Sequence, residues 1–369
     1  MATSTGSAPG RLDLLGGVAD YSGALVLETP TRLATMVTAE PSDALEVGPV
    51  RLAVDEVVKL AGLTYPEVRD ALVELPRWTH YLVGVAIVLV RHEVIEPPAV
   101  RLTVSSDLPR SVGVSSSASL EVATARALGA DGLEPLRLAA LCQEAENQVV
   151  GAPCGIMDQV AVTVGTAGAV LPILCRPASV RPPLELPSGV EVVGWPTGAE
   201  HDVSGVPYRR ARTAGFMGKR LVEEALGESW AWISELPEEA VADLPDVLDG
   251  AAYLDRWATT DDPVTVVDPS VAYPVRAATA FGGDEHRRAS AAVAAIAGGD
   301  LAALGPLLAA SHAGYDAMGL GHPAATASVA SALARAGVHG ARSSGGGSGG
   351  TVVVVCDRGA LDDVAGLIR

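Results

Sequence analysis

Lysine is nearly absent from this sequence, since the 369-residue chain contains only Lys59 and Lys219. Aspartate and glutamate outnumber lysine and arginine by 44 to 26, which gives a formal net charge of −18. A chain this acidic offers no broad surface to the phosphates of nucleic acids or of anionic membranes. We therefore expect neither a nucleic-acid partner nor a membrane partner, and any bound phosphate must be held by a local arrangement of groups.

Long apolar runs and paired cysteines are also missing. The longest apolar run, Tyr81 to Val90, is about half of the roughly 20 residues that a membrane-spanning helix needs. The N-terminal segment lacks a basic region followed by an apolar stretch, so we expect no secretory signal and a cytoplasmic location. The 4 cysteines form no CxxC pair and no His-rich metal pattern, and we expect them to be buried thiols.

The composition is that of a globular protein, with 49% hydrophobic and 19% charged residues. At roughly 100–200 residues per domain, the length predicts two domains. Prolines cluster between residues 177 and 187, which marks a plausible boundary. We place the domains at residues 1–185 and 186–369.

Helical and strand patterns alternate along the chain and predict a mixed α+β protein. Apolar spacing predicts helices over residues 64–75, 79–94, 118–130, 133–151, 207–226, 289–299, 300–315 and 325–337. Strands are predicted over 26–38 after a hairpin-like opening, then over 100–105, 190–195 and 351–356. Residues 42–58 are expected to form short strands and turns, 157–174 to run towards strands, and the acidic stretch 235–268 to be a solvated helical region without chemistry.

A loop rich in serine and glycine, Pro109 to Ser119, joins the predicted strand 100–105 to the predicted helix 118–130. Unpaired backbone N–H groups and the helix dipole at such a junction favour an anion, so the loop is a candidate phosphate site. It is not a P-loop of the GxxxxGK[ST] type, because no lysine precedes its serines. The alternative is that the serines only cap the helix.

Two carboxylates flank a turn of glycine and proline. Glu146 lies late in the predicted helix 133–151, and Asp158 follows the turn at 151–155. Mg²⁺ prefers hard oxygen ligands, so a glutamate and a serine hydroxyl suffice beside phosphates and water. An aspartate beside such a turn can accept a proton from a substrate hydroxyl. The alternatives are that Glu146 is a solvated helix residue and that Asp158 is a helix cap.

A third segment, residues 343–351, is a run of glycines that leads directly into a strand of valines. Such a loop allows the backbone to approach a ligand closely. The alternative is a flexible linker, but a linker that continues at once into a buried strand is less natural.

These segments together resemble the motifs of the GHMP small-molecule kinases, named after galactokinase, homoserine kinase, mevalonate kinase and phosphomevalonate kinase. The three family motifs occur in order at 10–23, 109–119 and 340–350, and the sugar-kinase string GAPCGIMDQ lies at 151–159. The first and third motifs, with AGFMGKRL at 214–221, are most similar to the sugar 1-kinase branch of galactokinases and L-arabinokinases. The resemblance implies an N-terminal ribosomal-S5-like α/β domain, a C-terminal ferredoxin-like domain and an active site in the cleft between them.

The resemblance implies an enzyme that uses ATP and Mg²⁺ to phosphorylate a free sugar at its anomeric hydroxyl. Asp158 matches the catalytic aspartate that accepts the proton of this hydroxyl, and Arg11 matches the arginine that pairs with it. A neighbouring guanidinium favours the charged carboxylate and offsets charge on the phosphoryl oxygens. Ser117 and Glu146 match the residues that bind Mg²⁺. Phosphoryl transfer depends mainly on such positioning and charge neutralisation.

The resemblance also assigns residues to the sugar and the nucleotide. Those matched to sugar contacts are Asp20, the backbone of Gly155, and Tyr208. Those matched to the ATP phosphates are Gly113, Val114, Ser115, Ser116, Ser117 and Ala118. Those of the third-motif loop are Gly345, Gly346, Gly347, Ser348 and Gly349.

Two departures from the family pattern bear on the substrates. Gly17 and Val18 stand where galactokinases carry a Glu-His pair that faces the C6 hydroxymethyl group of galactose. L-Arabinose in its pyranose form lacks this carbon, so the predicted reaction forms L-arabinose 1-phosphate. The second departure is the non-glycine sequence at 110–112, which restricts the phosphate loop if it needs positive φ.

Other interpretations remain open. The acceptor could be galactose, or glycine could make room for a C6-modified sugar or a uronic acid. A regulator that binds sugar and ATP with weak catalysis is a third possibility. The protein is expected to be a monomer or a homodimer with a sugar and ATP as its small-molecule partners.

Overall fold

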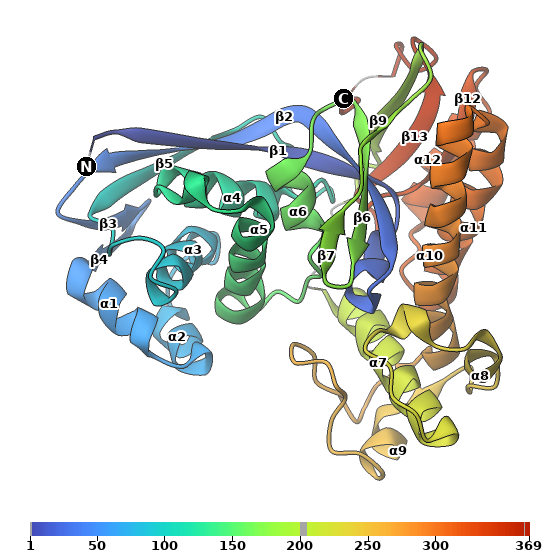
Figure 1. Ribbon diagram of the computed structural model, residues 1–369, viewed down its shortest axis with the longest axis horizontal. Coiled ribbons are helices and arrows are strands. Elements are labelled where there is room, and N and C mark those ends of the chain that lie inside the picture. Colours follow the sequence, from blue (N-terminus) through green and yellow to red (C-terminus); the bar gives the residue numbers. More distant parts are fainter. Residues whose placement is uncertain (1, 200–204, 365) are drawn as a thin grey trace. The chain divides into compact units, whose positions relative to one another are not determined.

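The computed structural model describes residues 2–199, 205–364 and 366–369 (Figure 1). The chain forms two compact units, each built from separate stretches of sequence. The first unit is Met1–Arg11, Pro30–Arg110 and Ser115–Ala167; the second is Leu12–Thr29, Ser111–Val114 and Gly168–Arg369. The boundary that we place between residues 185 and 186 falls inside the second unit, so the division into sequence domains stays a prediction.

The first unit combines a sheet with α-helices. Its strand order is β4-β3-β5-β2, with β5 antiparallel to β2 and parallel to β3. The strands are β3 (Ala44–Val47), β4 (Val50–Ala53), β5 (Val100–Ser106) and parts of β1 (Ser4–Leu15) and β2 (Leu25–Pro41). The helices are α1 (Val54–Gly62), α2 (Tyr65–Leu72), α3 (Thr79–Arg91), α4 (Ser116–Ala127), α5 (Pro135–Glu144) and α6 (Met157–Val164), with a 3-10 helix at Ala130–Gly132 and a π-helix at Ala145–Val150.

The core of the first unit is organised around α3. Residues 82–89 of this helix are all buried, which fits a sequence that is apolar on every face. α3 packs against α1, α4, α5 and the π-helix. This core therefore holds the helices that carry several of the candidate site residues.

The second unit contains a larger and a smaller arrangement of strands. The first part of β2 pairs with β6 (Ala169–Cys175), which also pairs with β7 (Ala178–Val180) and β8 (Leu184–Glu185). A three-stranded antiparallel sheet has the order β12-β13-β9, formed by β9 (Val190–Pro196), β12 (Val338–Ser343) and β13 (Thr351–Asp357). A short pair joins β10 (Leu248–Asp249) and β11 (Ala272–Tyr273).

Two helices, α11 and α12, pack on the three-stranded sheet. Figure 1 shows α10, α11 and α12 beside β12 and β13, and α11 and α12 both pack on β12. The helices are α7 (Val206–Leu226), α8 (Glu238–Ala242), α9 (Gly250–Leu254), α10 (Val275–Gly298), α11 (Leu304–Met318) and α12 (Pro323–Leu333), with 3-10 helices at Gly17–Ser22, Ile233–Glu235 and Leu301–Ala303. Residues 352–356 of the central strand β13 are all buried, as their unbroken apolar character predicts.

Most of the predicted elements are confirmed, and three are wrong in part. The segment 157–174 begins with helix α6 before it reaches strand β6, and residues 54–58 open helix α1 instead of continuing in strands. The acidic stretch 235–268 is not simply a solvated helical region. It contains strand β10, and the side chain of Asp262 is completely buried.

Three of the 4 cysteines are buried in the structure. These are Cys142, Cys175 and Cys356, as predicted. Cys154 differs, because it is partly exposed. In residues 2–199, 205–364 and 366–369, no helix combines the length and the apolar character needed to cross a membrane.

Candidate active site

Arg11 and Asp158, predicted to act together, form an ion pair within the first unit. The Arg11 Nε donates a hydrogen bond of 2.9 Å to Asp158 Oδ1, and Nη2 lies 2.8 Å from the same oxygen. Arg11 comes from β1 and is almost fully buried, whereas Asp158 lies in the first turn of α6 and keeps 20% of its side chain exposed. The carboxylate is thus held by a fixed guanidinium and still reaches solvent. The alternative that Asp158 serves as a helix cap is not supported, because within the described residues α6 has no side-chain capping hydrogen bond.

Glu146 is buried, so its interpretation as a solvated helix residue is wrong. It lies in the π-helix, a rare helical form that often occurs at functional sites. Gln159 Nε2 donates hydrogen bonds to Glu146 Oε2 at 2.7 Å and to Glu121 Oε2 at 3.0 Å. Burial, together with the charge of Asp158, raises the pKa of Glu146. Burial and the charge of Glu146 also raise the pKa of Glu121.

The turn between these carboxylates is held by side-chain hydrogen bonds. Asn147 Oδ1 accepts from Cys154 N at 2.8 Å, and Asn147 Nδ2 donates to Cys154 O at 3.2 Å. Gly155 follows in the same turn and is buried just before α6. Because both amide groups of Asn147 are engaged, the backbone that carries Gly155 has a defined position relative to Asp158.

The residues predicted to bind Mg²⁺ lie together. The Ser117 hydroxyl, in the first turn of α4, forms a hydrogen bond with Glu146 that lowers the pKa of this carboxyl and opposes the effect of burial. In the described ranges, no cluster of three or more histidine, cysteine or acidic side chains has the geometry of a metal site. One carboxylate and one hydroxyl beside further negative charge are a hard-oxygen donor set, which fits a cation that takes its other ligands from phosphates and water.

The phosphate loop adopts the positive φ angles that its glycine-poor sequence makes costly. The φ angles are 55° at Ser111, 75° at Gly113 and 57° at Ser115. Ser115 directly precedes α4, but within the described residues its side chain makes no capping hydrogen bond and its Oγ has no partner. The helix-capping interpretation is therefore wrong for Ser115. Ser116, Ser117 and Ala118 form the first turn of this helix.

Replacing Ser111 by glycine should raise the free energy of unfolding by about 1 kcal/mol. A residue with a side chain loses roughly 1–2 kcal/mol in the left-handed region, and the greater freedom of glycine in the unfolded chain offsets part of this gain. Urea unfolding of both proteins measures the difference. Ser328→Gly in the middle of α12 is the matched control and should lose about 0.5 kcal/mol instead. A loss of stability in Ser111→Gly would contradict the inferred strain.

In the second unit, the predicted sugar-binding residues Gly17, Val18 and Asp20 lie in the buried 3-10 helix Gly17–Ser22. Asp20 Oδ1 accepts a hydrogen bond of 2.7 Å from Tyr21 N. This places its carboxylate against the backbone of its own turn. Tyr208, from α7, lies near this turn, because its ring meets the ring of Tyr21 edge to face at 6.3 Å.

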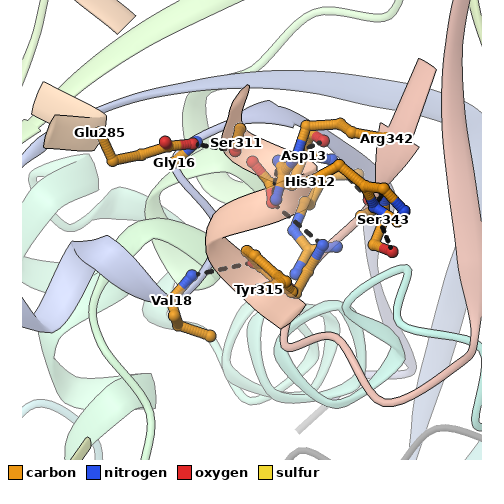
Figure 2. Close-up of polar contacts among 12 residues, drawn as sticks. Asp13, Gly16, Val18, Glu285, Ser311, His312, Tyr315, Arg342 and Ser343 are labelled. Atoms are coloured by element: carbon orange, nitrogen blue, oxygen red, sulfur yellow. Dashed lines mark hydrogen bonds and ion pairs between the residues drawn. The ribbon is translucent and has the colours of Figure 1, made fainter. Parts of the chain in front are cut away.

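Two helices hold the backbone of this turn. Glu285 of α10 accepts a hydrogen bond from Gly16 N at 3.0 Å, and Tyr315 of α11 accepts one from Val18 N at 3.2 Å (Figure 2). Gly17, between them, has φ 51°, and a Cβ built on it would lie 1.7 Å from the Tyr315 Oη. A side chain at position 17 is thus incompatible with Tyr315 in its present place.

A buried ion pair supports the same turn from α7. Arg212 donates bidentate hydrogen bonds of 2.8 and 2.9 Å to Asp262, and its guanidinium lies 5.1 Å from the centre of the Tyr21 ring. Both charged side chains are buried. The acidic stretch to which we assign no chemistry therefore supplies a buried counterion beside the predicted sugar-binding turn.

The third-motif loop is buried and hydrogen-bonded, so the flexible-linker interpretation is wrong. Asp13 Oδ2 accepts a hydrogen bond of 3.0 Å from Arg342 Nη1 (Figure 2). It accepts a second one, also of 3.0 Å, from Gly345 N. Ser348 N donates to Leu320 O at 2.6 Å. Positive φ angles occur at Gly345, Gly347, Ser348, Gly349 and Gly350, and all loop residues from Gly345 to Gly349 except Ser348 are buried.

Sequence reasoning did not assign roles to several of these residues. Gln159 belongs to the string GAPCGIMDQ and Asp13 to the first motif, so the motifs contain them without indicating what they contact. Glu121 and Tyr315 lie in helices predicted only from apolar spacing. The only feature of the sequence that could have indicated Glu121 and Tyr315 is a charged or hydroxyl-bearing residue on an otherwise apolar helix face.

Comparisons with known proteins agree with this arrangement. Residues 80–166 match the family model described as "GHMP kinases N terminal domain", and residues 292–366 match "GHMP kinases C terminal". A galactokinase of Chloroflexus aggregans is 32% identical over 380 residues, which cover 99% of this chain and 87% of that protein. The chain therefore belongs to the GHMP kinase family, a family of phosphotransferases, and the predicted family, fold and enzyme class are confirmed.

Relatives of two kinds are similar to the chain. An L-arabinokinase of Arabidopsis thaliana is 31% identical over 440 residues, which cover 94% of this chain but 42% of that longer protein. The crystal structure of Lactococcus lactis galactokinase complexed with galactose matches with a TM-score of 0.77 at 22% identity, covering 96% of this chain and 86% of the other. At this identity the structural match establishes the two-domain GHMP kinase fold with mixed α and β elements.

Proposed function

We propose that the protein transfers the γ-phosphoryl group of ATP to the anomeric hydroxyl of a free sugar, with L-arabinose as the acceptor and L-arabinose 1-phosphate as the product. The observation that carries the proposal is the pairing of Asp158 with Arg11 at 2.8–2.9 Å at the start of α6. A partly exposed carboxylate held by a buried guanidinium is suited to receive a proton from a substrate hydroxyl.

The reaction consists of one proton transfer and one phosphoryl transfer. Asp158 accepts the proton of the anomeric hydroxyl, and the anomeric oxygen forms a bond to the γ-phosphorus. The bond from this phosphorus to the oxygen that bridges the β and γ phosphates breaks, and ADP leaves. Arg11 orients Asp158 through Nε and Nη2 and supplies positive charge beside the reacting groups.

The remaining residues position the nucleotide. The backbone N–H groups of residues 113–118 and the start of α4 would hold its phosphates, because helix N-termini bind anions. Ser117 and Glu146 would hold Mg²⁺, which neutralises phosphate charge when bound. Positive charge there would also relieve the mutual repulsion of Glu146 and Asp158, which raises the pKa of Glu146.

The surroundings of Gly17 support a pentose acceptor. If glycine had replaced a larger residue to make room for a modified C6 group, open space would surround it. Instead, the Tyr315 hydroxyl lies 1.7 Å from the point where a Cβ would begin. The site therefore gains no volume at this position, and Gly17 and Val18 present no polar side chain to a C6 hydroxyl.

Galactose is the second candidate, favoured by the similarity to galactokinases over nearly their whole length. A hexose would bury its C6 hydroxyl beside Gly17 and the methyl groups of Val18. An unpaired buried hydroxyl costs about 1–3 kcal/mol, so kcat/KM should favour L-arabinose over D-galactose by roughly tenfold or more. Asp158 and Arg11 are both present and paired, which supports catalysis over a purely regulatory role.

A coupled ADP-release assay with free sugars tests the proposal. L-Arabinose, D-galactose, a uronic acid and a methyl glycoside of L-arabinose are compared, and the glycoside should release no ADP because its anomeric oxygen is blocked. Phosphorus NMR of the product should show coupling between phosphorus and H1. Preference for galactose or for a uronic acid would overturn the pentose assignment. Tight binding of sugar and ATP without ADP release would favour the regulator, and phosphate on another hydroxyl would contradict the 1-kinase.

A further inference from the structure

Tyr315 has no role in the reaction described above, yet it lies between two of the three family motifs. Its side chain is completely buried in the second unit. On one side, a Cβ on Gly17 would meet its Oη at 1.7 Å, and on the other, a Cβ on Gly347 would meet its Cδ1 at 2.6 Å. The ring is therefore enclosed by a glycine of the first motif and a glycine of the third, and neither position can carry a side chain while Tyr315 is present.

The phenol hydroxyl joins the two motifs by hydrogen bonds. Val18 N donates to Tyr315 Oη at 3.2 Å (Figure 2). Tyr315 Oη in turn donates to the carbonyl oxygen of Gly345. Burial raises the pKa of Tyr315, so the hydroxyl keeps its proton and can donate. Its single proton and an acceptor lone pair are both used, one on each motif.

The charged network next to the ring holds the third motif in place. The Arg342 guanidinium lies 5.0 Å from the centre of the Tyr315 ring, and the same arginine bonds to Asp13. Asp13 also accepts from Gly345 N, so both the N–H and the C=O of Gly345 are engaged. A shift of Gly345 would therefore be transmitted through the phenol to Val18.

We propose that Tyr315 is a positioning residue that couples the sugar-binding turn Gly17–Ser22 to the glycine loop 345–350, and that it replaces the side chain absent at position 17. The proposal rests on the proposed function for the identity of the sugar, but the coupling itself is a property of the second unit. Because Val18 and Asp20 share a short 3-10 helix, fixing the N–H of Val18 also restricts the carboxylate of Asp20.

Tyr315→Phe keeps the ring and removes the hydroxyl that is hydrogen-bonded to both motifs. Tyr253→Phe is the matched control. Tyr253 is also completely buried in the second unit, and its hydroxyl bonds at 3.3 Å to Thr259 O, away from the motifs. We expect Tyr315→Phe to raise the KM for the sugar about tenfold with kcat changed less than threefold, while Tyr253→Phe leaves both constants unchanged. A folded Tyr315→Phe protein with the wild-type sugar KM would overturn the proposal.

Hydrogen exchange gives a readout that needs no activity. In Tyr315→Phe, peptides that contain residues 16–22 and 345–350 should both exchange at least fivefold faster than in wild type, and neither should change in Tyr253→Phe. Unchanged exchange at either peptide would overturn the coupling, even if the enzyme phosphorylates the expected sugar. Conversely, faster exchange in both peptides with no kinase activity in wild type would refute the proposed function and leave the coupling standing.

Gly17→Ala tests the same contact from the other side if Tyr315→Phe does not fold. The added methyl collides with the Tyr315 hydroxyl, so the sugar KM should rise at least fivefold, and a folded variant with unchanged KM would overturn the proposal. Adding Tyr315→Leu removes the collision. Gly17→Ala should then lower the melting temperature less than it does in the wild-type background. Equal decreases in both backgrounds would show that Tyr315 does not occupy the place of the missing side chain.

Discussion

Replacing Asp158 by asparagine should reduce kcat about 10²–10⁴-fold, the usual contribution of a general base. Asparagine has nearly the same shape, and its carbonyl oxygen can still accept the hydrogen bond that Arg11 Nε donates at 2.9 Å. It cannot take the proton of the anomeric hydroxyl. The phosphate loop and α4 are untouched, so the dissociation constant of an ATP analogue should change little.

The measurement is the rate of ADP release at saturating sugar, with nucleotide binding determined by calorimetry on the same preparation. Arg11 is almost fully buried and loses its charged partner in this variant, so unfolding must be followed in parallel to exclude loss of folded protein. Asp131→Asn, at a largely exposed side chain of the first unit, is the matched control and should keep wild-type turnover. Near-normal kcat in folded Asp158→Asn would show that another group accepts the proton.

The sequence predicts well those elements whose pattern and environment agree. Residues 82–89 are apolar without interruption and form the buried part of α3, and the valines of 351–356 form the central strand β13. The segment after residue 157 is misleading because Val160, Val162 and Val164 alternate with other residues at the period of a strand. Packing of α6 against α5 and α4 overrides this local preference.

The site residues are predicted from motifs, but several of the residues that hold them in place lie outside these motifs. Asp262 lies in a stretch whose charge predicts solvation, and its burial depends on Arg212, which is far away in the sequence. Tyr315 looks like an ordinary core aromatic at helical spacing. Its role follows from the absence of a side chain at Gly17, and no pattern along one chain reveals that the two residues occupy the same space.

Replacing Asp13 by asparagine should lower the free energy of unfolding by about 3–5 kcal/mol. Asp13 and Arg342 are both completely buried, and Arg342 Nη1 lies 3.0 Å from Asp13 Oδ2. The charge of a buried guanidinium is stabilised by its counterion and not by water. Removing one partner of such a pair therefore leaves an uncompensated charge, which is much more costly than the loss of the hydrogen bond alone. The hydrogen bond from Gly345 N weakens as well, because its acceptor is no longer charged.

Urea unfolding, followed by tryptophan fluorescence and by far-UV circular dichroism, measures this change in the free energy of unfolding. Asp43→Asn removes one of the two acidic partners of Arg51 at a mostly exposed site and should change stability little, since such pairs are screened by water. Adding Arg342→Gln to Asp13→Asn should recover part of the loss, because the unpaired charge is then gone. A single variant as stable as Asp43→Asn, or a double variant that loses the sum of both single effects, would show that Asp13 does not act as the counterion of Arg342.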